Sequence, residues 1–141
     1  MLSQDEDGWT KLYLAARNNH IEEAKKMMKE ANYLNVASEL VNKGSNGGYT
    51  PLIEASKRGH LQMAQLFITN GAEIDKAGWM MTPLIAASRW GHLEVVNLLI
   101  EHQADVHLKN LKNSRGKTAL DYARQYGYTA IEKALQEAGA K

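Results

Sequence analysis

The chain of 141 residues contains no cysteine, only two prolines and one phenylalanine, and no long apolar run. The absence of cysteine excludes disulfides, a thiol nucleophile and thiolate metal sites, and it fits a reducing, intracellular compartment. Apolar runs such as Leu98-Leu99-Ile100 are far shorter than the ~20 residues that a membrane-spanning helix needs. We therefore expect one intracellular domain that makes no membrane contact.

The chain also lacks a charge excess of either sign. Seventeen Lys and Arg residues face sixteen Asp and Glu residues, which gives a formal net charge of +1. A nearly neutral chain has no global field that would attract nucleic acid or an acidic membrane, so such partners would need a local patch. Residues 1–6 form an acidic N-terminal tail without the apolar segment of a secretory signal.

The two prolines stand in the same tripeptide, Thr50-Pro51-Leu52 and Thr82-Pro83-Leu84. Each threonine is followed ten residues later by a histidine, and the same frame extends outward from Thr10 and Thr118. Four copies of one unit therefore cover a single domain, residues 7–139, with repeats at about 7–45, 46–76, 77–110 and 111–139. Repeats of this length are typical of a solenoid.

Each copy predicts two short helices. Thr accepts a hydrogen bond from a free helix amide at the N-cap, and Pro at the first helical position lacks the amide that would be unpaired. In the third copy we expect helices over 83–90 and 92–101, with Gly91 ending the first. In the fourth copy, Thr118 and Asp121 have the spacing of a capping box. The pattern does not determine the path of the additional residues 31–45.

The segments Thr50-Pro51-Leu52-Ile53-Glu54-Ala55 and Thr82-Pro83-Leu84-Ile85-Ala86-Ala87, each followed by Gly-His-Leu, resemble the ankyrin repeat. The resemblance implies an all-α solenoid of four helix-turn-helix units joined by β-hairpin-like loops, with the terminal units acting as caps. It also implies a concave face made of loop tips and first helices. Ankyrin-like repeats can be substrates of asparagine hydroxylation, and Asn42 is the nearest match.

The chain departs from the family at several places, among them the additional residues 31–45 and Lys11, which replaces the proline in the first copy. Tyr13, Ile53, Ile85 and Asp121 replace a frequent histidine, and Met80 replaces the usual hairpin glycine.

Three histidines, His20, His60 and His92, recur at one position of the repeat. Stacked helices lie ~8–10 Å apart, whereas zinc requires each nitrogen within about 2.1 Å of one ion. We therefore expect these side chains to pack and hydrogen-bond at the turn between helices. No phosphate loop, nucleophile elbow or carboxylate pair is visible, so we predict no enzyme activity, no cofactor and no metal.

Repetition places certain basic and aromatic residues in line on the first-helix face and at the loop tips. Trp, Tyr and Arg dominate binding hot spots, and large apolar residues at loop tips favour a covering partner. The expected partner-binding residues are Trp9, Arg17, Tyr49, Lys57, Arg58, Trp79, Met80, Met81, Arg89, Trp90 and Tyr126. Two simpler interpretations stay open: basic residues stabilise a helix C-terminus, and Trp9 and Tyr49 cover neighbouring loops.

The sequence thus predicts a monomeric, non-catalytic module that binds a protein or peptide on its concave face. Trp90 and Trp79 are the expected anchors, Met80 and Met81 provide adaptable packing, and the basic residues attract an acidic segment. The alternatives are a regulatory inhibitor, a structural ankyrin segment of a larger protein, and an engineered ankyrin binder. Nucleic-acid binding has little support, because no element that enters a groove is predicted.

Overall fold

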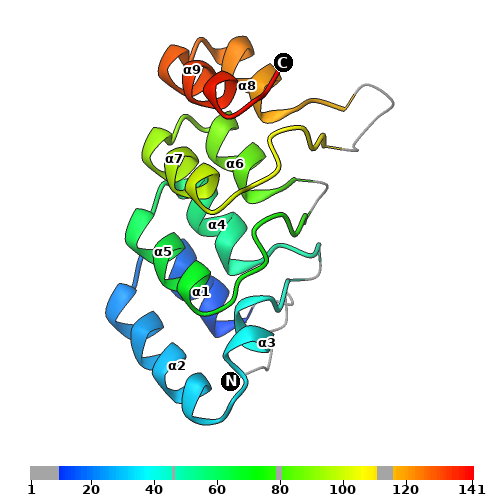
Figure 1. Ribbon diagram of the computed structural model, residues 1–141. Coiled ribbons are helices and arrows are strands. Elements are labelled where there is room, and N and C mark those ends of the chain that lie inside the picture. The colour runs from blue at the N-terminus through cyan, green and yellow to red at the C-terminus, as the bar shows by residue number, and fades with distance from the viewer. Residues whose placement is uncertain (1–9, 46, 79–80, 111–115) are drawn as a thin grey trace.

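The computed structural model describes residues 10–45, 47–78, 81–110 and 116–141, which form a stack of helix pairs with loops projecting to one side (Figure 1). The acidic tail, Trp9, Trp79 and Met80 lie outside the described residues. The helices are α1 (Lys11–Arg17), α2 (Ile21–Tyr33), α3 (Ala37–Val41), α4 (Pro51–Arg58), α5 (Leu61–Thr69), α6 (Pro83–Arg89), α7 (Leu93–Glu101), α8 (Ala119–Tyr126) and α9 (Thr129–Glu137). The predicted all-α solenoid is confirmed.

The first helix of each pair begins at a threonine cap. The hydroxyl oxygens of Thr10, Thr50, Thr82 and Thr118 accept hydrogen bonds from the amide three residues on, at 3.1–3.2 Å. Asp121 completes the capping box by accepting from the Thr118 amide at 2.9 Å. Local sequence therefore determines where these helices start.

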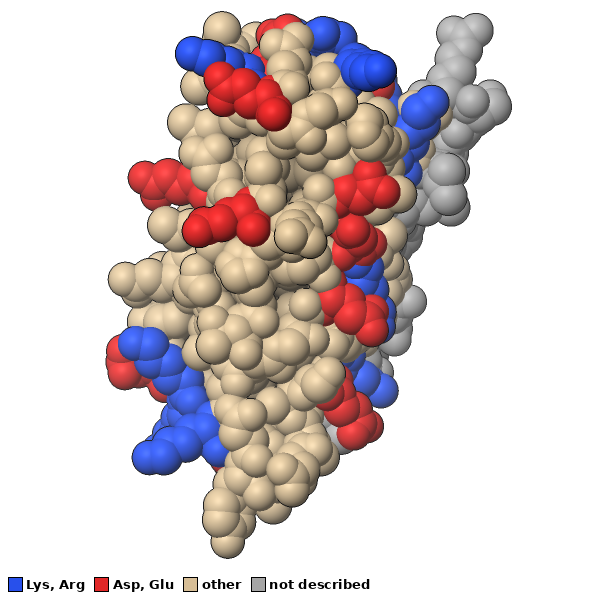
Figure 2. Space-filling view, in the orientation of Figure 1, with Lys and Arg blue, Asp and Glu red and all other residues tan. Residues whose placement is uncertain are grey.

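The helices lie in two layers. The first helices α1, α4, α6 and α8 contact one another in order, and the second helices α2, α5, α7 and α9 form the other layer. Buried alanines on the first helices allow their close approach: Ala15, Ala16, Ala55, Ala86, Ala87, Ala119 and Ala123. Seen from the second helices, the surface has a broad uncharged band, with lysines over α2 and acidic side chains toward the loops (Figure 2).

The additional residues of the first repeat form a clamp against the second repeat. Helix α2 continues to Tyr33, and the short helix α3 follows. The Asn42 side chain, which caps α3, donates to the backbone oxygen of Gly71 at 3.0 Å and accepts from the amide of Glu73 at 2.8 Å. The insertion therefore ties the first repeat to the linker that follows α5.

The loops carry only short β-hairpin contacts in the described residues, as two isolated antiparallel bridges, Gly78 with Met81 and Lys109 with Thr118. The first bridge corrects one sequence expectation. Met81 was expected at a loop surface, but its side chain is 6% exposed and belongs to the core. Because Met81 exchanges both backbone hydrogen bonds with Gly78 immediately before the α6 cap, its side chain packs beneath the loop and is not available to a partner.

Candidate functional site

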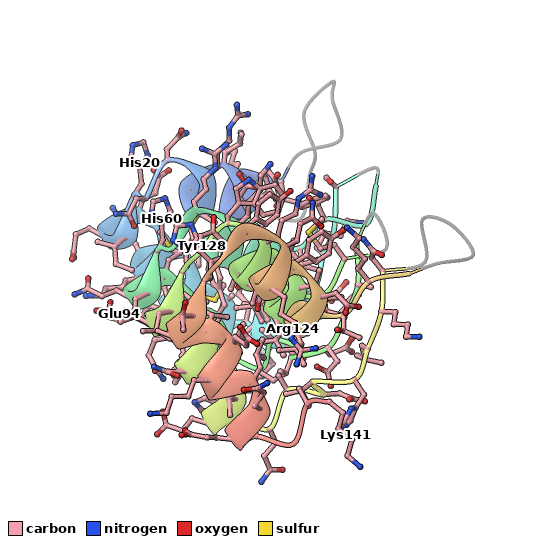
Figure 3. The ribbon with its side chains drawn as sticks, turned by 90° about the horizontal axis from the view of Figure 1, so that it is seen from above. His20, His60, Glu94, Arg124, Tyr128 and Lys141 are labelled. Carbon is pink, nitrogen blue, oxygen red and sulfur yellow. The ribbon has the colours of Figure 1, made fainter. Side chains whose placement is uncertain are left out.

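Consecutive repeats are joined at the turn between their helices. The His92 Nε2 atom lies 2.9 Å from the backbone oxygen of Lys57, and His60 makes the equivalent hydrogen bond with the backbone of Arg17. Arg17 and Lys57 each end the first helix of the preceding repeat. Looking down the stack, His20, His60 and Tyr128 lie along one edge (Figure 3). These joints bring the first helices into line.

The joint explains the recurrence of His60 and His92, whereas His20, in the first repeat, is exposed and lies 3.6 Å from Glu23. Across the described part of the chain, no group of three His, Asp or Glu residues could hold a metal ion. Burial lowers the pKa of His60, and the nearby charges of Arg58 and His92 lower it further. A neutral imidazole suits a position inside a helix-to-helix joint.

Basic and aromatic side chains from α4, α6 and α8 form one connected row. Lys57 Nζ lies 5.0 Å and Arg89 Cζ 4.7 Å from the ring centroid of Trp90. Arg89 Cζ also lies 5.5 Å from the ring of Tyr122, and Lys117 Nζ lies 5.5 Å from the same ring. We call these five residues the cation–aromatic row. The repeat frame predicted the meeting of Lys57, Arg89 and Trp90, since it placed them at the ends of neighbouring first helices.

The row continues into an aromatic cluster at the C-terminal end of the stack. The rings of Tyr122 and Tyr126 are stacked, with centroids 6.5 Å apart and planes 5° from parallel. Tyr128 follows at 5.9 Å from Tyr126, whose side chain is 46% exposed. Sequence analysis did not select Tyr122, although the repeat frame places it one turn before Tyr126 on the same helix face.

A buried carboxylate binds a tyrosine and an arginine in the N-terminal half of the stack. Glu54, on α4, is 2% exposed and accepts hydrogen bonds from the Tyr13 hydroxyl at 2.7 Å and from Arg58 Nε at 2.5 Å. Burial, and then the hydrogen bond to Glu54, raises the pKa of Tyr13. Tyr49 meets the Tyr13 ring edge-on at 6.4 Å. Because Glu54 balances Arg58, this cluster adds little net charge to the face.

The expected partner-binding residues therefore occupy different environments. Lys57, Arg89 and Trp90 come together half-buried, with Tyr126 connected to them through Tyr122. Arg58 and Tyr49 belong to the Glu54 cluster, and Arg17 is exposed at the end of α1. Sequence reasoning did not select Glu54. The signal was that Glu54 is acidic, whereas the aligned residues of the other three repeats, Leu14, Ala86 and Tyr122, are not.

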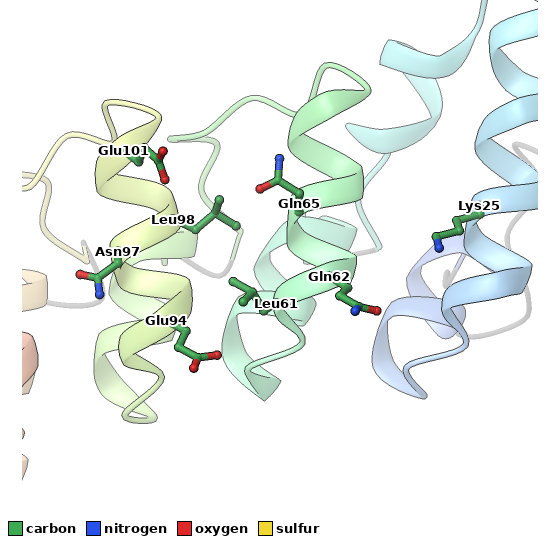
Figure 4. A pocket seen from close by; sticks show the side chains of 8 residues that line it. All are labelled: Lys25, Leu61, Gln62, Gln65, Glu94, Asn97, Leu98 and Glu101. Carbon is green, nitrogen blue, oxygen red and sulfur yellow. The ribbon is translucent and has the colours of Figure 1, made fainter.

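A groove lies between the second helices, on the side of the stack away from the cation–aromatic row. It is an open groove of about 520 Å³ lined by α2, α5 and α7 (Figure 4). Leu61 and Leu98 contribute apolar surface, whereas the charged lining residues are Lys25, Glu94 and Glu101. The lining residues include no aromatic side chain, and one lysine faces two glutamates, so the groove offers neither an aromatic anchor nor a positive patch and is a weaker candidate than the cation–aromatic row.

A stack of helix pairs with aligned side chains defines a repeat solenoid that offers a surface for recognition. A family model described as ankyrin repeats, in three copies, matches residues 1–77 and 75–141, so the chain belongs to the ankyrin repeat family. Ankyrin repeats are in general non-catalytic protein-interaction modules. No curated protein matches the chain. Within the described residues, no helix combines the length and the apolar character that crossing a bilayer requires.

Proposed function

We propose that this chain is a non-catalytic module that binds an acidic segment of a protein or peptide on its first-helix face. One observation carries the proposal: the cation–aromatic row concentrates positive charge, and no described carboxylate pairs with Lys57 or Arg89. The nearest acidic residue of α4, Glu54, is buried and bound to Arg58. A positive patch of this kind speeds encounter with a negative partner.

The aromatic residues of the same face provide contact area. Trp90 packs against the core on one side, so its ring is held in place before a partner arrives. Tyr126 offers an exposed ring at the end of the row. Rigid aromatic side chains bind with a small loss of conformational entropy. We keep Trp9, Trp79 and Met80 as proposed contacts on sequence grounds alone.

Selection from a displayed library of random peptides tests the proposal directly. We expect selected peptides to be rich in Asp and Glu and to lose about tenfold in affinity, or about 1.4 kcal/mol, with the Trp90→Ala variant. The same measurement with Trp79→Ala tests that sequence-based anchor. Peptides that bind both variants as tightly as the unaltered protein would show that the anchors are wrongly assigned.

Charge reversal separates steering from contact. Arg89→Glu should slow association at low salt and flatten its salt dependence, because it removes the attraction at the centre of the row. Lys133→Glu is the matched control, since it makes the same change in net charge at an exposed position on α9. If both variants slow association equally, net charge rather than the row governs the encounter.

We also propose that the chain acts as a monomer inside the cell and does not bind nucleic acid. The absence of cysteine supports an intracellular compartment, and the net charge of +1 argues against nucleic-acid binding. Sedimentation analysis and a mobility-shift assay at physiological salt would test it, and a concentration-dependent dimer or a salt-resistant shift would contradict it.

A further inference from the structure

Two positive charges lie against the ring of Trp90, and neither has a negative partner among the described residues. Lys57 Nζ and Arg89 Cζ lie 5.0 and 4.7 Å from one ring centroid, so the charges are separated by less than the sum of these two distances. Both residues are half-buried. Among the described residues, neither side chain has an ion pair or a hydrogen bond, and only aromatic faces hold the two cations.

The hydrogen-bond donors of these cations are therefore available to a ligand. The Arg89 guanidinium is positioned against Trp90, the residue that caps the end of α6, and against Tyr122 on the neighbouring helix α8. A guanidinium has its N–H donors in a rigid planar fork that fits two oxygens of one anion, and a lysine adds three further donors. Two aromatic contacts reduce the freedom of the fork before an anion binds, which lowers the cost of binding.

The charge of the site matches a doubly charged group better than a carboxylate. A carboxylate balances one of the two cations and leaves the other unpaired, whereas a phosphate monoester carries about −1.5 to −2 charges and three acceptor oxygens. A nucleic-acid phosphodiester carries one charge for each phosphate, as a carboxylate does. We infer that Lys57 and Arg89 bind the phosphoryl group of a phosphorylated side chain in the partner segment. The inference rests on the proposed function, because that segment must lie on the first-helix face.

Titration of the full, ¹⁵N-labelled chain with phenyl phosphate tests the site, followed through the Trp90 indole and Arg89 Nε signals. Benzoate at equal ionic strength is the singly charged comparison. We expect phenyl phosphate to shift both signals and to bind at least about fivefold more tightly than benzoate. Equal affinity for the two compounds, or shifts confined to other residues, would overturn the inference.

Variants separate this site from general attraction to a basic surface. Lys57→Ala and Arg89→Ala should each weaken phenyl phosphate binding about fivefold, whereas Lys133→Ala should leave it unchanged. Lys57→Ala keeps the backbone oxygen that bonds to His92, so the repeat joint stays intact. Unchanged binding in both site variants, or an equal loss in the Lys133 control, would overturn the assignment.

A peptide comparison distinguishes this inference from the proposed function. One position of a library-selected peptide is made phosphoserine, aspartate or serine, and each version is measured with the unaltered chain and with Arg89→Ala. We expect phosphoserine to bind about fivefold more tightly than aspartate, and Arg89→Ala to remove that difference. If acidic peptides need Trp90 but phosphoserine gives no gain at any position, the inference is wrong and the proposed function stands.

Two further outcomes contradict the inference. If no peptide binds the first-helix face at all, the proposed function fails and the phosphorylated segment fails with it, even if phenyl phosphate binds. If a ten-residue oligothymidylate binds more tightly than the phosphopeptide at the same salt, the row recognises a phosphodiester chain instead.

Discussion

Replacing Tyr13 by phenylalanine removes one hydrogen bond from a buried carboxylate and leaves the ring in place. Tyr13 is 3% and Glu54 2% exposed, and the hydroxyl donates to Glu54 Oε2 at 2.7 Å. Hydrogen bonds to charged groups contribute about 1.5–3 kcal/mol, and water cannot replace this donor at a buried site. We expect Tyr13→Phe to lower the free energy of unfolding by about 2 kcal/mol, which for a chain of this size lowers the melting temperature by roughly 4–8 °C.

A double-mutant cycle isolates the interaction. Glu54→Leu introduces the residue that the first repeat already has at the same place, Leu14, but it leaves the Tyr13 hydroxyl and Arg58 without their acceptor. We expect Glu54→Leu alone to cost about 2–4 kcal/mol, and much less when Tyr13 is already phenylalanine. Urea unfolding followed by circular dichroism gives each free energy.

Tyr49→Phe is the matched control, since it removes the hydroxyl of the neighbouring tyrosine, which has no hydrogen bond to a described residue. It should change stability by less than about 0.5 kcal/mol. If Tyr13→Phe changes the free energy of unfolding as little as Tyr49→Phe does, the tyrosine does not stabilise the carboxylate. The reasoning also fails if the free-energy changes of Tyr13→Phe and Glu54→Leu are additive in the double mutant.

Three further predictions concern the stack itself. Gly91→Ala should destabilise the fold by several kcal/mol and Gly127→Ala by only about 1–2 kcal/mol. Both residues have positive φ, but only at Gly91 would an added Cβ lie 2.8 Å from a ring atom of Tyr128 in the next repeat. Equal losses in urea unfolding would contradict this. Ser56→Ala and Ser88→Ala should each raise the melting temperature and increase the free energy of unfolding by about 1 kcal/mol, since both hydroxyl oxygens are buried without a partner in the described residues. A loss of stability would contradict this and indicate that a bound water satisfies the hydroxyl. The pKa of His60 is lowered in the folded state, so the unfolded chain binds more protons just below pH 6.5 and the free energy of unfolding falls there as the pH is lowered. His60→Gln should reduce the difference between the free energies of unfolding measured in urea at pH 7.5 and at pH 5.5. An unchanged difference would refute the prediction.

Features that depend on neighbours in the chain could be predicted from the sequence. The four threonine caps and the Thr118–Asp121 capping box involve atoms three residues apart, and the left-handed glycines end helices where the pattern places them. The period then predicts which side chains share a face. For this reason the meeting of Lys57, Arg89 and Trp90 follows from the repeat frame before any coordinates are known.

The path of residues 31–45 and the burial of Met81 could not be predicted in this way. Asn42 closes the insertion by binding the backbone of Gly71 and Glu73, and a chain pattern does not reveal such distant partners. Met81 is a large apolar residue at a predicted loop tip, which favours an exposed contact. In the structure its β-bridge with Gly78 directs the side chain into the core.

The sequence by itself determined that this protein is an ankyrin solenoid, because repeated caps and glycines act over a few residues and each copy repeats them. Only the tertiary structure decided how charge is distributed on its first-helix face. There Glu54 is paired with Arg58 and buried, while Lys57 and Arg89 have aromatic neighbours and, within the part of the chain that the structure describes, no carboxylate. The Glu54–Arg58 pair itself lies four residues apart on α4, as the sequence allows. The hydrogen bond from Tyr13 to Glu54 and the aromatic contacts of Lys57 with Trp90 and of Arg89 with Tyr122 join separate repeats, so they depend on the packing of neighbouring helices.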